Sequence, residues 1–128
     1  MEPSNAQRWT GRVLSGLAVL FLTFDGVMKL VKPAFVVDAT KELGYPESSI
    51  VAIGMLVLVG VALYVVPRTA VLGAIFLTGF LGGAVATHVR VGSPLLSHVL
   101  FPTYLAAMLW GGLTLRNERV RVLLANGG

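Results

Sequence analysis

The sequence has 128 residues, of which 55% are hydrophobic and only 12% are charged, with a net charge of +4. A water-soluble domain of this length has too much surface to hide so much apolar material, so lipid is the expected solvent. The basic residues are spread over segment ends without interleaved aromatic residues, which argues against a nucleic-acid-binding surface. The absence of cysteine excludes disulfides, thiolate metal sites and thiol–disulfide redox chemistry carried by this chain.

Four long apolar runs dominate the chain: Val13–Val31, Ile50–Val66, Ala70–Val89 and Leu95–Leu115. Each has about the 17–25 residues with which a helix crosses the hydrocarbon of a bilayer. Arginines precede the first run, as in a signal peptide, but the run is too long and lacks a small-residue cleavage site, so we expect a retained span. The sequence therefore predicts an all-α fold, a transmembrane four-helix bundle over 13–115, with a polar tail at 1–12 and a basic tail at 116–128.

The connections between the runs carry turn signals. A proline-containing turn divides the second run from the third, and Thr69 is placed to cap the third helix. Gly92 is suited to the end of the third helix and Ser93 to the cap of the fourth. The longest connection, Lys32–Ser49, has apolar residues at helical spacing, which predicts a short amphipathic helix at the membrane interface between the first two spans.

Basic residues set the expected orientation. The N-terminal tail, the second connection and the C-terminal tail carry six arginines, whereas the basic residues of the opposite side are diluted by acidic ones. The positive-inside rule therefore favours a multi-pass protein of the cytoplasmic (inner) membrane with both termini in the cytoplasm.

Small residues mark the expected helix contacts, because helices in lipid associate through close van der Waals approach. The third run supplies a small-residue set that includes a G-x-x-x-G pattern: Gly79, Gly82, Gly83 and Ala86. Glycines in the second and fourth runs offer similar approaches. A glycine face of this kind can pack against another helix of the same chain or against a second copy of the chain in a homo-oligomer. The sequence does not decide between these two uses.

Ionisable residues gather near one side of the predicted membrane. Asp25 and Lys29 are four residues apart on one helix face and can pair, and ionisable residues inside a membrane are functional candidates. His88, Arg90 and His98 flank the turn between the last two runs, on the same predicted side. These five residues are therefore a candidate ligand-binding cluster. The alternative is that Lys29 reaches the interface and neutralises Asp25, while Arg90 anchors to headgroups and each histidine makes an ordinary interfacial hydrogen bond.

Pro102 bears on the same region. Within a helix it would leave the carbonyl of His98 without its hydrogen bond, so that carbonyl would need a side chain, water or ligand as a partner. Two histidines without a carboxylate or cysteine in the same segment are a weak metal signal, because a third ligand would have to be Asp25 across the bundle, and we predict no metal site. A haem held by His88 and His98 at one end of the bundle is disfavoured but left open. The sequence contains no phosphate-binding loop, dinucleotide fingerprint or nucleophile elbow.

Five segments are similar to a known family: FDGVMKL in the first run, LGYP in the first connection, VPRTAVLGAIFLTGFLGGAVATHVRVG, SHVLFP and WGGLTLRNERVR. They resemble the DoxX-like family of small four-helix integral membrane proteins, related to DoxX and DoxD. The resemblance implies a four-helix bundle in the cytoplasmic membrane. The wider group is similar to the DoxD subunit of thiosulfate:quinone oxidoreductase, and other DoxX proteins are associated with membrane oxidoreductase complexes. Relatives carry an acidic residue in a G-x-x-E-like context early in the second span, where this chain has the apolar Gly54-Met55-Leu56-Val57.

Two functional interpretations follow. In the first, the chain is a subunit of a membrane oxidoreductase complex that binds a quinone or another lipophilic ligand, with a histidine on a carbonyl oxygen and Asp25 with Lys29 balancing a proton. Such a subunit needs a redox partner protein, and the missing acid of the second span weakens this interpretation. The alternative is a non-catalytic scaffold, or an assembly or stress-protection factor, that acts through partner proteins. A transporter is disfavoured because four helices rarely enclose a pore and no inverted repeat is visible; whether the chain is an enzyme stays open.

Overall fold

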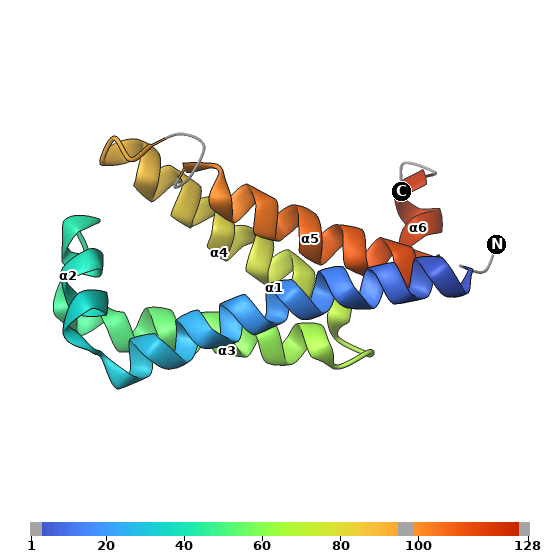
Figure 1. Ribbon diagram of the computed structural model, residues 1–128, viewed down its shortest axis with the longest axis horizontal. Helices are drawn as coiled ribbons and strands as arrows, with labels where there is room; N and C mark the ends of the chain where they lie inside the picture. The colour runs from blue at the N-terminus through green and yellow to red at the C-terminus, as the bar shows by residue number, and fades with distance from the viewer. Residues whose placement is uncertain (1–3, 95–98, 126–128) are drawn as a thin grey trace.

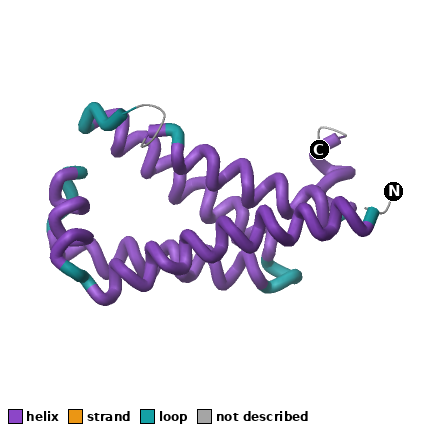
Figure 2. Tube along the Cα trace, viewed as in Figure 1, coloured by secondary structure: helices purple, strands orange, loops and turns teal. Residues whose placement is uncertain are grey.

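The computed structural model describes residues 4–94 and 99–125. Every regular element in those ranges is helical, as predicted (Figure 2). The elements in chain order are α1 (Asn5–Val31), α2 (Ala34–Glu42), the short 3-10 helix η1 (Glu47–Ser49), α3 (Ile50–Val65), α4 (Ala70–Arg90), α5 (Phe101–Arg116) and α6 (Glu118–Ala125). The four longest helices, α1, α3, α4 and α5, lie lengthwise against one another, while α2 and α6 cross opposite ends (Figure 1).

Three helices within the described residues are long and apolar enough to cross a membrane. They are α1, the helical stretch Glu47–Val65 that ends with α3, and α4. These three match the first three predicted spans and support a multi-pass membrane protein. The described part of the fourth predicted span is shorter, because α5 has 16 residues and begins at Phe101. Residues 95–98 of that span, which include His98, lie outside the described residues.

The first helix begins earlier than the apolar run. Ser4 Oγ accepts the Gln7 backbone N–H at 3.2 Å, and Gln7 Oε1 accepts the Ser4 N–H at 2.9 Å. This capping box gives partners to two backbone N–H groups that would otherwise have none. The helix therefore starts at Asn5, inside the segment expected to be a polar tail. The helix ends where Lys32 adopts a left-handed conformation just before Pro33.

The expected cap of α4 by Thr69 is wrong. Thr69 occupies the N-cap position, but its side chain makes no capping hydrogen bond to α4. Instead its hydroxyl donates to the carbonyl of Leu63 at 2.7 Å. In a continuing helix the partner of that carbonyl would be the N–H of residue 67, and Pro67 has none. The hydroxyl therefore closes the preceding helix, α3.

The turn after α4 begins as predicted, at Gly92, whereas the predicted cap by Ser93 concerns a helix start at residues 95–98, which lie outside the described residues. Gly92 ends the helix with a positive φ of 74°, which suits glycine. Pro102 lies in the first turn of α5, where a missing N–H leaves no helical hydrogen bond unmade. Pro102 therefore lies at the start of the described helix, and its predicted effect on the carbonyl of His98 concerns a residue outside the described ranges.

Glycines set the closest approaches between the long helices. A Cβ at Gly73 on α4 would meet the backbone of Tyr64 on α3, and a Cβ at Gly112 on α5 would meet Ser15 and the carbonyl of Gly11 on α1. Around these contacts the largest fully buried side chains are Tyr64, Leu22, Ile50, Leu77, Leu109, Leu113 and Val57. The outer faces of the long helices are also apolar, as expected for helices surrounded by lipid.

The small residues singled out on α4 face away from the other helices. Among the described residues, a Cβ at Gly79, Gly82 or Gly83 would meet nothing within 4 Å, and Ala86 is exposed. The helical period explains this, because these positions lie opposite the buried Leu77 and Leu81. Close approach of α4 within the chain is made by Gly73 instead, and contact of the outer face with another chain stays a prediction.

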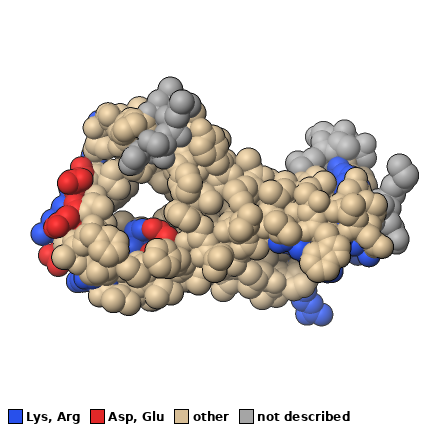
Figure 3. Space-filling model, viewed as in Figure 1, with Lys and Arg blue, Asp and Glu red and all other residues tan. Residues whose placement is uncertain are grey.

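The long helices separate toward the end that carries α2, which we call the α2 end; the opposite end is the α6 end. At the α2 end, α1 and α3 stay together while α4 and α5 diverge from them (Figure 1). Figure 3 shows an opening bounded by the two helix pairs and by α2, which we call the hollow. Both the start of α1 and the end of α6 lie at the α6 end, as expected for termini on one side.

Candidate functional site

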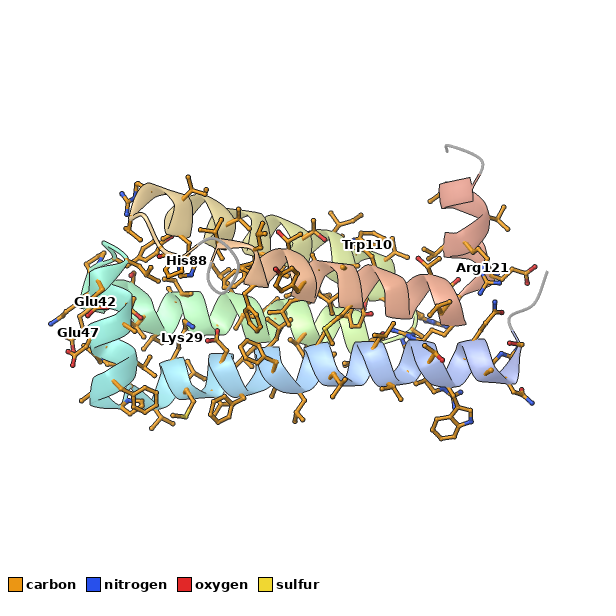
Figure 4. The ribbon with its side chains drawn as sticks, turned by 45° about the horizontal axis from the view of Figure 1, so that its top comes forward. Lys29, Glu42, Glu47, His88, Trp110 and Arg121 are labelled. Carbon is orange, nitrogen blue, oxygen red and sulfur yellow. The ribbon has the colours of Figure 1, made fainter. Side chains whose placement is uncertain are left out.

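The hollow contains charged groups. Figure 3 shows a basic and an acidic side chain together at its edge, and Figure 4 shows Lys29 projecting from α1 into the space below α4. Lys29 Nζ donates to Asp25 Oδ2 at 2.6 Å, and the side chains of Asp25 and Lys29 are 35% and 17% exposed. One helical turn separates the two residues, so they project from the same face of α1. The predicted ion pair is therefore present beside an open space.

The pair lies well inside the apolar part of α1. Arg12 and Lys32 are the basic residues nearest to the two ends of the apolar run, and they lie 20 residues apart along the chain. At the rise of an α-helix this separation is about 30 Å, the thickness of the hydrocarbon. Asp25 is seven residues before Lys32. Its carboxylate is thus about 10 Å deeper than the Lys32 end of the helix.

Two glycines allow α1 and α3 to cross at the ion pair. A Cβ on Gly54 would meet Lys29 Cβ at 2.8 Å and the carbonyl of Gly26 at 3.0 Å. A Cβ on Gly26 would in turn meet Val57 Cγ1 at 2.8 Å. This close backbone approach holds the stem of Lys29 against α3. Val57, the position at which the G-x-x-E pattern would place an acid, is fully buried. The carboxylate beside the hollow is that of Asp25, from α1.

Hydrogen bonds join the α2–α3 connection to the end of α4. Arg90 Nη2 donates to the carbonyl of Leu43 at 2.9 Å, and the hydroxyls of Tyr45 and Thr87 are 2.7 Å apart. The Thr87 hydroxyl donates to the carbonyl of Gly83, so the Tyr45 hydroxyl is the donor to Thr87. We call these two links the clamp; it ties the connection to α4 at the far edge of the hollow.

Gly44 is required by the clamp for two reasons. Its φ of 89° lies in the left-handed region that favours glycine. A Cβ at this position would also meet Arg90 Nη2 at 2.5 Å. The LGYP segment thus supplies the accepting carbonyl, the turn and the donating hydroxyl of the clamp.

The predicted cluster is distributed around the hollow. The ion pair belongs to α1, Arg90 belongs to the clamp, and His88 Nδ1 lies 3.0 Å from Ser93 Oγ. In Figure 4 the side chains of His88 and Lys29 project from α4 and α1 into the same space. His98 lies outside the described residues. Sequence reasoning missed the clamp hydroxyls, although both lie in segments that carry the family resemblance.

A second polar network, also missed, lies toward the α6 end. Arg116 Nε donates to Ser15 Oγ at 3.4 Å, the Ser15 and Tyr64 hydroxyls are 2.7 Å apart, and Tyr64 donates to the carbonyl of Leu109 at 2.5 Å. Since Tyr64 donates to Leu109, the Ser15 hydroxyl donates to Tyr64. Both hydroxyls of the network donate within it and Tyr64 is only 1% exposed, so its role is to join α1, α3 and α5.

The hollow is the better candidate for binding. An ammonium group has three N–H donors, of which Asp25 accepts one, and the carboxylate keeps accepting positions as well. The charged pair borders the hollow, whose other walls are apolar helices. A site of this kind suits a ligand with a polar head group and an apolar body. Across residues 4–94 and 99–125, no three His, Asp or Glu side chains gather as a metal-binding group.

Comparison with known proteins agrees with the resemblance seen in the sequence. No curated protein and no solved structure matches the chain. The model of the DoxX-like family matches residues 13–112, a stretch that includes the ion pair, the hollow and the clamp. The chain belongs to the DoxX-like family.

Proposed function

We propose that the chain is a four-helix transmembrane protein of the cytoplasmic membrane that binds a quinone, or a similar lipophilic carrier, in the hollow as a subunit of an oxidoreductase complex. The observation that carries the proposal is the ion pair of Asp25 and Lys29 beside an open space. Charged groups inside a membrane are costly, and proteins keep them chiefly where ions, protons or ligands bind. In this arrangement α5 belongs to the fourth span, α2 lies at the interface, and the arginine-rich termini are cytoplasmic.

The position of the hollow favours a ligand that arrives through lipid. The hollow opens on the flank of the helices in Figure 3, which is the side that faces the acyl chains when the long helices cross the bilayer. The clamp lies between the hollow and the membrane surface. A ligand soluble in lipid can therefore reach the ion pair without passing through water.

The residues present fit a quinone head. The Lys29 ammonium can donate a hydrogen bond to a carbonyl oxygen, and the Asp25 carboxylate can accept one from a hydroxyl or hold a proton. His88, on the opposite wall, is a second side chain whose ring nitrogens can donate or accept a hydrogen bond. A quinone supplies two-electron, two-proton chemistry that these side chains lack, so the electrons must be exchanged with a partner protein.

The test is the quinone content of protein extracted in native-lipid particles, measured by mass spectrometry as quinone per chain. The variant is Asp25→Asn with Lys29→Gln, which removes both charges together and leaves no unpaired ion in the membrane. Loss of charge-assisted hydrogen bonds is expected to lower retention by about tenfold or more. Lys32→Gln, at the same end but beyond the hollow, is the matched control and should retain the wild-type amount.

Equal quinone in wild type, control and the double variant would contradict the proposal. Thermal unfolding in the same particles shows whether the double variant keeps its fold. His88→Leu is the second variant, and it tests the opposite wall of the hollow without altering the ion pair.

A scaffold role is the second candidate, favoured by the outer face of α4. Gly79, Gly82 and Gly83 offer close backbone approach and meet no other helix among the described residues, and Ala86 beside them is exposed. The double variant Gly79→Leu with Gly83→Leu should preserve the fold and abolish cross-linking of α4 to a second copy or a partner subunit. Unchanged cross-linking, or none in wild type, would remove this candidate.

A further inference from the structure

The α6 end carries an excess of positive charge that the hollow does not explain. Among the described residues, the arginines at this end are Arg8, Arg12, Arg68, Arg116, Arg119 and Arg121, against one acid, Glu118. At the α2 end the numbers of basic and acidic residues are equal. The four basic residues are Lys29, Lys32, Lys41 and Arg90, and the four acidic residues are Asp25, Asp38, Glu42 and Glu47. Figure 3 shows this segregation, with acidic groups on the α2 side of the molecule.

Helix α6 is fixed across the end of the long helices. Arg121 Nη2 donates to the carbonyls of Thr114 at 3.4 Å and Leu115 at 3.0 Å, which are among the last carbonyls of α5. Asn117 Oδ1 accepts the backbone N–H of Val120 at 3.3 Å, and the Val120 side chain is only 3% exposed. Figure 1 shows the resulting sharp turn from α5 into α6.

The outward side of α6 combines basic and apolar groups. Arg119, Val122 and Leu123 line, with Glu118, a shallow depression of about 380 Å³. The side chains of Val122 and Leu123 are 46% and 56% exposed. This combination of arginine with exposed aliphatic residues is typical of helices that lie in the headgroup region of a membrane.

The start of α1 presents a similar pair. Trp9 is 65% exposed, and the Arg12 guanidinium lies 5.8 Å from the centre of its ring. Tryptophan next to arginine is characteristic of the membrane interface, because the ring lies among the headgroups and the guanidinium reaches phosphates.

The basic residues of the α2 end are arranged differently. Lys32 Nζ and Lys41 Nζ lie 4.0 Å and 3.7 Å from the two carboxylate oxygens of Glu47. Their charge is therefore partly neutralised within the chain. Arg12 and Arg119 are exposed, and the structure gives neither an ion pair with a described acid.

We propose that the α6 end binds the headgroups of anionic phospholipids in the surrounding leaflet, with Arg12 and Arg119 as principal contacts. The chain is a multi-pass membrane protein, so the ends of its long helices lie at the level of the headgroups. Guanidinium groups bind phosphate oxygens through paired hydrogen bonds, and clustered basic residues at a membrane surface select anionic over zwitterionic lipids. This inference is independent of the ligand in the hollow.

Native mass spectrometry of the full chain in detergent, with added phosphatidylglycerol or phosphatidylcholine, counts the lipids that remain bound. Wild type should retain phosphatidylglycerol preferentially. Arg12→Gln with Arg119→Gln should reduce that preference by about tenfold, since each basic residue near a membrane surface contributes to the attraction. Lys32→Gln with Lys41→Gln removes the same net charge at the other end and should leave the preference unchanged.

Three results would overturn the proposal. Equal lipid selectivity in wild type and the arginine variant would show that these side chains do not bind the headgroups. An equal loss in the lysine variant would show that net charge, and not this end of the molecule, controls selectivity. Excess inorganic phosphate is the third arm: wild type should keep its bound lipid, and displacement by phosphate would identify a site for a free anion instead.

Discussion

The α6 end and the α2 end are built from the same apolar helices, yet they use their polar residues in opposite ways. At the α6 end, Ser15, Tyr64 and Arg116 are linked to one another and to a backbone carbonyl, and Gly11, Gly73 and Gly112 bring the helices into close backbone contact. At the α2 end the helices diverge, and the Asp25–Lys29 pair borders the hollow. Burial with internal partners indicates a structural role, whereas charge beside open space indicates a site for binding.

The largest expected effect comes from filling the closed end. Gly112→Leu would place a side chain against Ser15 and the backbone of Gly11, where a Cβ already has no room. Overpacking of this kind should lower the free energy of unfolding by about 3 kcal/mol. Gly83→Leu is the matched control, because nothing lies within 4 Å of its Cβ position. Reversible unfolding in bicelles measures both, and equal stability of the two variants would contradict the assigned packing.

An intermediate loss of stability, without loss of the bound ligand, is expected from a change in the polar network around Tyr64. Tyr64→Phe removes the hydroxyl that links Ser15 to the carbonyl of Leu109. Hydrogen bonds between membrane helices contribute modestly, so we expect a loss of about 1 kcal/mol in unfolding free energy. Ligand retained in the hollow should not change. A Tyr64→Phe protein that lost its ligand but kept its stability would reverse the roles of the two ends.

The smallest expected effect concerns the clamp. Tyr45→Phe removes the hydrogen bond to Thr87 but leaves the link between Arg90 and Leu43 in place. We expect a global destabilisation of about 0.5–1 kcal/mol or less, with faster hydrogen exchange confined to the α2–α3 connection. Ser48→Ala, an exposed substitution in the same connection, should leave exchange at wild-type rates. Identical exchange in both variants would show that the clamp does not hold the connection.

Local sequence signals predicted the features that depend on a few neighbouring residues. The i, i+4 spacing gave the pairing of Asp25 with Lys29, and glycine marked the end of α4 at Gly92. The amphipathic pattern after Lys32 predicted the position of α2. Each of these depends on helix geometry or backbone conformation, which the local sequence determines.

Features that depend on distant partners could not be predicted in the same way. The outward direction of Gly79 and Gly83 follows from which face of α4 packs on α3 and α5, and a glycine pattern fits either face. The clamp joins Leu43 to Arg90, and its geometry exists only once the connection folds against α4. The hydroxyl of Thr69 could cap either adjoining helix, and the missing N–H of Pro67 directs it to α3.

The central claim is that the α2 end is a binding site and the α6 end of the core is structural. The most direct test compares quinone per chain in native-lipid particles for Asp25→Asn with Lys29→Gln and for Tyr64→Phe, with thermal unfolding measured on each. We expect the double variant to lose quinone by about tenfold or more, and Tyr64→Phe to keep it despite reduced stability. Quinone lost equally from both variants, or retained equally by both, would contradict the claim.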